Sequence, residues 1–319
     1  MNDLVLDLEY LRKTYPGKVP VNALNGISLQ VPRGSIFGLI GPNGAGKSTL
    51  IKSLLSILKP TECKGTLLGE AIGHRPTLER VGYLPEHIRF PEYLTGRQII
   101  EYAAGLSRLS RRSIAHRINA LLAEVDMLPH ADRCFSSYSK GMKQRIGLAQ
   151  ALIHDPEVIF LDEPTDGIDP EGRRDFRDLI IGLRDGGRTV FVNSHLLPEV
   201  EKMADRIAIL YQGNILLAGA VCDLSGDEWH YEVTHQNPLP TSLMTWCQEQ
   251  NFTSHEYKLT VRVEHATALQ PVIDRLRAGD VIITSIHEHR LSLEDLYLHT
   301  IDQARGQNRQ ALTLNVTKK

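Results

Sequence analysis

A glycine-rich run near residue 45 constrains this chain more than any other feature. Residues 41–49 fit the phosphate-binding pattern G-x-x-x-x-G-K-[S/T], in which glycines let successive backbone N–H groups converge on phosphate oxygens. We expect Lys47 to place its positive charge at the β- and γ-phosphates, and the hydroxyl of Ser48 to ligate Mg²⁺. The run therefore predicts a nucleoside triphosphate site. Its predicted nucleotide-binding residues are Gly41, Pro42, Asn43, Gly44, Ala45, Gly46, Lys47, Ser48 and Thr49.

The segments on either side of the run support this interpretation. Residues 34–40 are typical of a buried strand, and leucines and isoleucines recur at helical spacing from residue 50 until Pro60 ends the pattern. A strand, a glycine loop and a helix N-terminus together favour anion binding. A glycine-rich turn with a purely structural role is the alternative, and this context disfavours it.

Length, charge and cysteine usage exclude several classes of protein. The chain has 319 residues, which is long enough for two domains, and its formal net charge of −2 gives no support to wholesale binding of nucleic acid or anionic lipid. Scattered cysteines without metal-ligand spacing indicate reduced thiols in a cytosolic protein. The cysteines are Cys63, Cys134, Cys222 and Cys247.

The sequence also predicts no signal peptide and no membrane span. The start of the chain lacks a basic segment followed by an apolar one, and no window approaches 18 uninterrupted apolar residues. The most apolar stretch, residues 207–221, is broken by polar residues and predicts a β-hairpin. If the protein works at a membrane, we expect another protein to cross it.

Apolar periodicity predicts an α/β chain with a smaller α+β domain after it. Alternating strands ahead of the glycine loop predict an antiparallel edge sheet, and continuous apolar runs around residues 158–161 and 189–192 predict a parallel core. We expect the first domain to span residues 1–225, with a helical insertion at about 88–155. The second domain is expected at 228–302, and the polar residues 303–319 are expected to form a disordered tail.

Two adjacent acids follow one of the predicted core strands. Asp162 and Glu163 come directly after residues 158–161, at the sheet edge where open α/β proteins bind ligands. We expect Asp162 to orient the Mg²⁺ shell and Glu163 to polarise the attacking water. Solvated loop acids are the alternative, and the glycine loop upstream disfavours it.

Four motifs in a fixed order resemble the ATPases of ABC transporters. They are the glycine loop, residues 138–145 (Tyr-Ser-Lys-Gly-Met-Lys-Gln-Arg), residues 161–170 (LDEPTDGIDP) and residues 193–195 (Asn-Ser-His). The resemblance covers roughly residues 4–222 and implies a P-loop NTPase fold of ABC type. It implies that Ser139 and Gly141, in the second motif, bind the γ-phosphate of ATP held by the opposite subunit.

The same resemblance implies roles for three further residues. Tyr15 matches the aromatic residue that stacks on adenine, although a plain turn tyrosine remains the alternative. Asp169 matches a position that contacts the P-loop of the partner subunit. His195 matches the switch histidine that hydrogen-bonds the γ-phosphate, so Lys47, Glu163 and His195 are the expected catalytic residues.

Three positions depart from the general family pattern. Glu86 stands where many relatives have a glutamine that senses Mg²⁺; a carboxylate there would bind Mg²⁺ more strongly but repel the γ-phosphate. Lys140 and Met142 replace a glycine and a glutamine in the second motif. Lys140 either adds positive charge near the phosphates of the partner or points to solvent. These variants, and residues 291–298, are similar to an exporter branch that includes drug, lipid and polysaccharide transporters.

Together these patterns predict an ATP-hydrolysing motor subunit of a transporter. The resemblance implies a head-to-tail homodimer that sandwiches two Mg-ATP, with separate transmembrane permease subunits and a place on the cytoplasmic face of the membrane. We expect no direct contact with nucleic acid. The alternatives are a soluble ABC ATPase acting on DNA or ribosomes, a P-loop kinase and a non-hydrolysing regulator. The missing heptad arm and basic tract disfavour the first, the second motif disfavours the kinase, and the intact catalytic residues disfavour the regulator.

Overall fold

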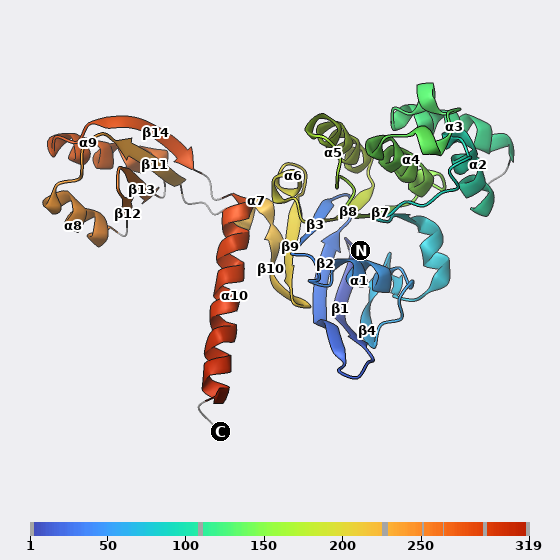
Figure 1. The fold of residues 1–319 in the computed structure, drawn as a ribbon, viewed down its shortest axis with the longest axis horizontal. Helices are drawn as coiled ribbons and strands as arrows, with labels where there is room; N and C mark the ends of the chain where they lie inside the picture. The colour runs from blue at the N-terminus through green and yellow to red at the C-terminus, as the bar shows by residue number, and fades with distance from the viewer. Residues whose placement is uncertain are drawn as a thin grey trace. The chain divides into compact units, whose positions relative to one another are not determined.

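The computed structural model describes residues 3–107, 111–224, 229–250, 252–263, 265–289 and 292–316 (Figure 1). The chain divides into two compact units. One comprises the chain up to Val221 together with residues from Gln303 onward, and the other is Cys222–Asp302. The domain boundary expected at residues 225–228 falls outside the described residues. Within the described part, no helix has the length and apolar character that a membrane span requires.

A six-stranded sheet forms the centre of the first unit, with the strand order β10-β9-β3-β8-β7-β6. All neighbouring strands are parallel except β10, which pairs with β9 as the expected hairpin. Every residue of β3, β7 and β8 is buried, which explains their continuous apolar runs. The predicted parallel core is therefore confirmed. Its strands are β3 (Ile36–Ile40), β6 (Val81–Leu84), β7 (Val158–Asp162), β8 (Thr189–Ser194), β9 (Arg206–Tyr211) and β10 (Asn214–Ala220).

A second, antiparallel sheet has the order β2-β1-β4-β5 and confirms the predicted edge sheet. Alternating residues of β1, among them Leu6 and Leu8, are fully buried. They join one hydrophobic cluster with Phe37 of β3 and Leu50 of the helix that follows it, so the two sheets share a core. The strands are β1 (Leu4–Tyr15), β2 (Val21–Pro32), β4 (Glu62–Leu67) and β5 (Glu70–Ala71).

Helices connect the core strands and form the predicted insertion. Helix α2 begins with a capping box between Thr95 and Gln98, and α4 begins at the N-cap Ser139. In Figure 1, α2, α3 and α4 gather beyond the β7 side of the central sheet. The helices of this unit are α1 (Lys47–Leu54), α2 (Gly96–Leu106), α3 (Arg111–Glu124), α4 (Lys140–Leu152), α5 (Pro170–Asp185), α6 (Leu197–Glu201) and the short 3₁₀ helices Arg75–Arg80, Leu128–His130 and Phe135–Ser137.

The second unit contains an antiparallel four-stranded sheet with the order β12-β13-β11-β14, together with helices. Its core is apolar and includes Val233, Leu259, Val261 and Leu276, each fully buried. Its elements are helix α7 (Val221–Leu224) at the junction, β11 (Trp229–His235), α8 (Thr241–Glu249), β12 (Thr253–His255), β13 (Lys258–Val263), the 3₁₀ helix Ala266–Leu269, α9 (Gln270–Ala278) and β14 (Ile283–His289).

The last helix differs from the sequence-based expectation. Residues 303–316, expected to be a disordered tail, continue helix α10 (Leu293–Val316). Polar composition suggested disorder, but this segment contains no proline and only one glycine, and its alanine, leucine, glutamine and arginine residues favour helix.

Candidate functional site

The glycine loop folds between β3 and α1, as its pattern predicts. Gly46 adopts a left-handed φ of 111°, and a Cβ at this residue would lie 2.6 Å from the carbonyl oxygen of Ala23. A Cβ at Gly41 would lie 2.2 Å from the carbonyl oxygen of Leu210. Any side chain at these two positions would therefore displace backbone, which explains why the loop needs glycine there. Helix α1 starts at Lys47, so its N-terminus faces the loop.

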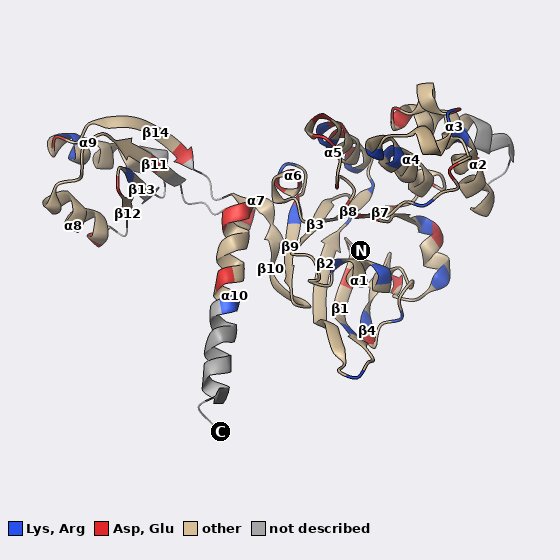
Figure 2. Cartoon of the chain, in the orientation of Figure 1, with Lys and Arg blue, Asp and Glu red and all other residues tan. Residues whose placement is uncertain are grey.

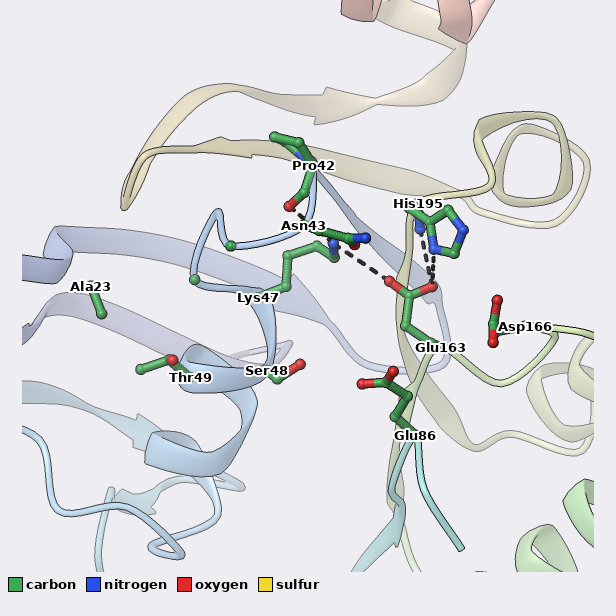
Figure 3. Close-up of a pocket in the computed structure, with 12 residues that line it drawn as sticks. Ala23, Pro42, Asn43, Lys47, Ser48, Thr49, Glu86, Glu163, Asp166 and His195 are labelled. Carbon is green, nitrogen blue, oxygen red and sulfur yellow. Dashed lines mark hydrogen bonds and ion pairs between the residues drawn. The ribbon is translucent and has the colours of Figure 1, made fainter.

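A cavity of about 520 Å³ opens beside this loop (Figure 3). Its volume is typical of a small-molecule site. The loop residues Pro42 to Thr49 form one side, and acidic residues from the ends of β6 and β7 form the other. The lining residues are Ala23, Pro42, Asn43, Gly44, Gly46, Lys47, Ser48, Thr49, Glu86, Glu163, Asp166 and His195.

The side chain of Lys47 folds back onto the glycine loop and contacts its backbone. Its Nζ donates to the carbonyl oxygen of Gly41 at 2.7 Å and lies 3.4 Å from Oε1 of Glu163. The side chains of Lys47 and Glu163 are only 6% and 9% exposed. Removing one partner from such a buried pair would leave the other charge uncompensated, at a cost of about 3–5 kcal/mol.

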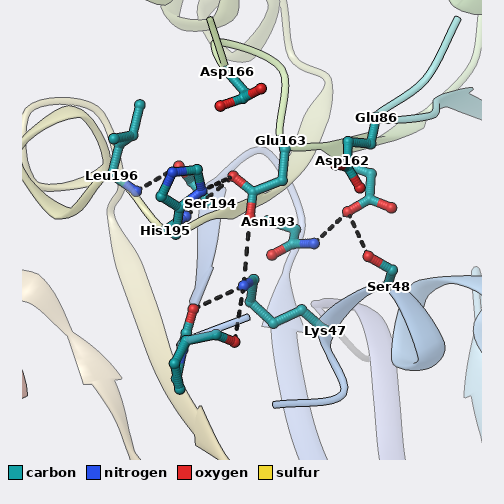
Figure 4. Close-up of polar contacts among 12 residues, drawn as sticks. Lys47, Ser48, Glu86, Asp162, Glu163, Asp166, Asn193, Ser194, His195 and Leu196 are labelled. Carbon is teal, nitrogen blue, oxygen red and sulfur yellow. Dashed lines mark hydrogen bonds and ion pairs between the residues drawn. The ribbon is translucent and has the colours of Figure 1, made fainter. Parts of the chain in front are cut away.

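Glu163 connects Lys47 to the end of the next strand (Figure 4). Its Oε2 accepts the backbone N–H of His195 at 3.1 Å and lies 2.8 Å from Nδ1 of the same histidine. Glu163 also has a positive φ of 50°, a conformation that costs energy in a residue other than glycine and is often found at functional sites. The backbone turn after β7 thus directs this carboxylate into the cavity between a lysine and a histidine.

Asp162 is buried behind the cavity wall and is 1% exposed. Its Oδ1 accepts hydrogen bonds from Ser48 Oγ, at 3.1 Å, and from Asn193 Nδ2. Burial raises the pKa of Asp162 above its usual value, and the hydrogen bonds from Asn193 and Ser48 oppose that rise. The two residues expected near Mg²⁺, Ser48 and Asp162, therefore contact each other directly.

The sequence-based reasoning assigned no role to Asn193. This residue is opposite Asp162 in the register of β7 and β8, and it is fully buried. A polar residue that directly continues the apolar run of residues 189–192 was the available signal. Tyr83 on β6 lies close to the same acids: burial, together with the negative charges of Asp162 and Glu86, raises its pKa to about 12.

The remaining predicted residues occupy different positions. Glu86 lines the cavity as expected, whereas Tyr15, Ser139, Gly141 and Asp169 are not among its described lining residues. Tyr15 ends β1, and its ring centroid lies 5.0 Å from Nζ of Lys13. Ala23 and Asp166, which were not predicted, do line the cavity.

Ser139 and Asp169 instead cap helices. Ser139 Oγ accepts the N–H of Met142 at 3.3 Å at the start of α4, and Asp169 Oδ2 accepts the N–H of Gly172 at 3.4 Å at the start of α5. These contacts satisfy free N–H groups at the helix starts. A single subunit therefore brings together the loop, both acids, Glu86 and His195, but not the residues expected to act across a dimer.

Comparison with known proteins identifies the family. A sequence profile described as "ABC transporter" matches residues 24–166. The chain is 44% identical over 301 residues to an ABC transporter ATP-binding protein of Nostoc sp. (strain PCC 7120), covering 92% of this chain and 88% of the relative. It is 32% identical over 315 residues to the daunorubicin resistance ATP-binding protein DrrA3 of Streptomyces coeruleorubidus, covering 95% of each chain.

Solved structures agree with this relationship. The cbiO1 protein of Clostridium perfringens, described as part of the ABC transporter complex cbiONQ, is similar with a TM-score of 0.63 and 27% identity, covering 70% of this chain and 91% of that chain. An ATP-binding cassette solved as a dimer with ADP and phosphate shares the fold, with a TM-score of 0.62 and 23% identity over 68% of this chain and 98% of that chain. The chain therefore belongs to the ATP-binding proteins of ABC transporters, the ATPases that couple ATP hydrolysis to transport.

Proposed function

We propose that this chain is the ATP-hydrolysing motor subunit of an exporter, and that it works as a head-to-tail homodimer beneath separate permease subunits. The observation that carries the proposal is the carboxylate of Glu163, which faces the cavity between Lys47 and His195. A carboxylate at this place is within reach of a water molecule that attacks the terminal phosphate.

The ion pair between Lys47 and Glu163 supports a defined order of events. Lys47 is 3.4 Å from Glu163, so its ammonium group compensates the buried carboxylate. When ATP binds, the β- and γ-phosphates compete for Lys47. Glu163 is then released from this cation and becomes the general base, and His195 keeps the carboxylate oriented through its Nδ1 and backbone N–H.

The oxygen atoms near Ser48 fit Mg²⁺. Mg²⁺ prefers hard oxygen ligands and is usually held by one or two carboxylates together with substrate phosphates. Ser48 and Asp162 supply a hydroxyl and a carboxylate that already contact each other, and Glu86 supplies a second carboxylate at the cavity. The described residues contain no cluster of three or more His, Cys, Asp or Glu side chains that could hold a metal. We infer that Ser48, Asp162 and Glu86 would hold Mg²⁺ together with the phosphates of the nucleotide, and that the ion would neutralise phosphate charge.

The homodimer is supported by three predicted nucleotide-contacting residues that do not line the cavity of their own subunit. Ser139, Gly141 and Asp169 match nucleotide-contacting positions of the family but lie outside the lining of their own cavity. A second copy that presents these residues would complete the site. The cassette solved as a dimer with ADP and phosphate gives a precedent for such pairing.

Permease binding is supported by exposed apolar side chains around the helical insertion. Tyr93, Tyr102 and Leu106 are 77%, 64% and 68% exposed. Tyr102 and Leu106 are four residues apart on α2 and so share one face of that helix, and exposed apolar surface of this kind is typical of interaction sites. Charged residues of both signs are interspersed over the first unit in Figure 2, which favours a protein partner over nucleic acid.

Export is favoured by two relatives, DrrA3 and the Nod factor export ATP-binding protein I of Rhizobium sp. (strain N33). The latter is 36% identical, and the match covers 69% of this chain and 72% of the relative.

The test is purification of tagged Glu163→Gln protein from detergent-solubilised membranes of its native host with ATP present. We expect a stoichiometric polytopic membrane protein in the mass spectrum, and its loss when Tyr102 and Leu106 are both changed to Asp. The double variant should still bind ATP, which serves as the folding control. Recovery only in the soluble fraction, with ribosomes or DNA-associated proteins, would contradict the transporter proposal and favour a soluble ABC ATPase.

A further inference from the structure

Lys140 makes a contact that neither sequence-based alternative anticipated. It is the first residue of α4, and its Nζ lies 2.8 Å from Oδ2 of Asp166, in the loop that follows β7 of the same subunit. Asp166 in turn lines the nucleotide cavity, on the side that holds Glu163 and His195 and away from Ala23 (Figure 3). Lys140 is therefore paired with a carboxylate from one wall of its own cavity, while about half of its side chain stays exposed to solvent.

The backbone next to Asp166 leaves space for this lysine. Gly167 has a φ of +64°, and a Cβ built on it would lie 2.3 Å from Nζ and 3.0 Å from Cδ of Lys140. The lysine side chain therefore lies across Gly167 and occupies the place of a side chain there. The hydrogen bond from Lys140 is the main cause that lowers the pKa of Asp166 below its usual value.

The charges of the cavity lining show why such support matters. Glu86, Glu163 and Asp166 contribute three carboxylates, and Lys47 is the one lysine or arginine among the described lining residues. Lys47 already compensates Glu163. A nucleoside triphosphate is a polyanion, so an uncompensated Asp166 would repel its terminal phosphate.

We propose that Lys140 is a positioning residue for nucleotide binding: it neutralises Asp166 and keeps that carboxylate at the cavity edge, so that the terminal phosphate can enter. This inference rests on the proposed function, because it assumes that the phosphates occupy the cavity beside Lys47. Both side chains are nearly half exposed, at 49% and 45%, so the pair contributes little to folding stability. The pair matters for ligand binding instead, because a bound triphosphate adds negative charge next to Asp166.

The test measures affinity for Mg·AMP-PNP and Mg·ADP by titration calorimetry on the full chain. We expect Lys140→Met to weaken AMP-PNP binding about fivefold, since an exposed charge interaction of about 1 kcal/mol corresponds to that factor. The loss should be smaller for ADP, which lacks the terminal phosphate. Asp166→Asn should bind AMP-PNP at least as tightly as the wild type, and adding Asp166→Asn to Lys140→Met should restore the affinity.

A matched control is Lys143→Met, which removes a lysine from the same turn of α4. Nζ of Lys143 lies 5.1 Å from the ring centroid of Phe135, and Lys143 does not line the nucleotide cavity, so AMP-PNP affinity should not change. If Lys140→Met and Asp166→Asn both weaken binding, the pair is a loop tether and the inference is wrong. No change in either variant would also overturn it. Failure of the wild-type chain to bind AMP-PNP would instead contradict the proposed function.

Discussion

The central sheet of the first unit and the sheet of the C-terminal unit differ in the polar groups that they bury. At the carboxyl ends of β7 and β8, Asp162, Glu163 and Asn193 are buried. The two carboxylates accept hydrogen bonds, whereas Oδ1 of Asn193 has no hydrogen-bond partner among the described residues. In the C-terminal unit, His235 is the only buried polar residue among those described, and the rest of the core is apolar. Burying charge costs free energy unless it is compensated. This edge of the central sheet therefore buries charge at a cost in folding stability, as the burial-raised pKa of Asp162 indicates, and it adjoins the nucleotide cavity.

The largest effect is expected at Lys47. Changing Lys47 to Ala removes the charge expected at the β- and γ-phosphates and leaves Glu163 buried without its cation. We expect ATP hydrolysis to fall by about 10²–10³-fold, the range seen when a group that stabilises transition-state charge is removed. A phosphate-release assay measures this loss, with the exposed Lys18→Ala variant as a control. A Lys47→Ala enzyme with more than a third of wild-type activity would contradict the role of the loop.

A core substitution in the C-terminal unit should lower stability but leave ATP hydrolysis nearly unchanged. Leu276 is fully buried in the core of that unit, and Leu276→Ala should cost about 2–5 kcal/mol of its unfolding free energy. Because Leu276 is remote in sequence from every residue of the nucleotide cavity and belongs to the other unit, basal ATP hydrolysis should stay within about twofold of wild type. Denaturant unfolding and the phosphate-release assay measure the two quantities. If Leu276→Ala also lowered ATP hydrolysis by much more than twofold, the two units would not be independent.

A smaller effect is expected when the buried charge of Asp162 is removed. Burial raises the pKa of Asp162 in the folded chain above its value in the unfolded chain. The protonated group therefore stabilises the fold at any pH below the unfolded pKa. This stabilisation is lost as the pH rises through the folded pKa. At pH 7 the ionised group therefore costs stability. Asp162→Asn keeps an oxygen that can accept from Ser48 and Asn193, and it should raise the Tm of the nucleotide-free chain by about 2–4 °C. Thermal melts in EDTA at pH 7 test whether the Tm of Asp162→Asn rises, and an unchanged or lower Tm would contradict the prediction.

Much of the site could be predicted from the sequence because its groups lie in local patterns. The glycine loop depends on backbone geometry. Asp162 ends β7, Glu163 follows it and His195 follows β8, so parallel pairing must bring the three residues to one edge. The fold class followed from the same strand patterns.

Other features depend on contacts between distant segments, which a local pattern does not encode. The ion pair of Lys140 with Asp166 requires the packing of α4 against the loop after β7, over 26 residues of separation. Ala23 reaches the cavity only because β2 passes beside Gly46. Tyr15, Ser139, Gly141 and Asp169 were assigned by resemblance, the last three to positions that a dimer would bring together, so their nucleotide contacts remain predictions.

The most direct measurement compares Glu163→Gln with wild type in steady-state ATP hydrolysis and in ATP binding. If Glu163 is the general base, kcat falls by about 10²–10³-fold, while ATP affinity is retained and a stable ATP-bound dimer accumulates in size-exclusion chromatography. Glu171→Gln, in the first turn of α5, is the control and should leave kcat unchanged. Hydrolysis by Glu163→Gln at the wild-type rate would show that another group activates the water, and the assignment of this carboxylate would then be wrong.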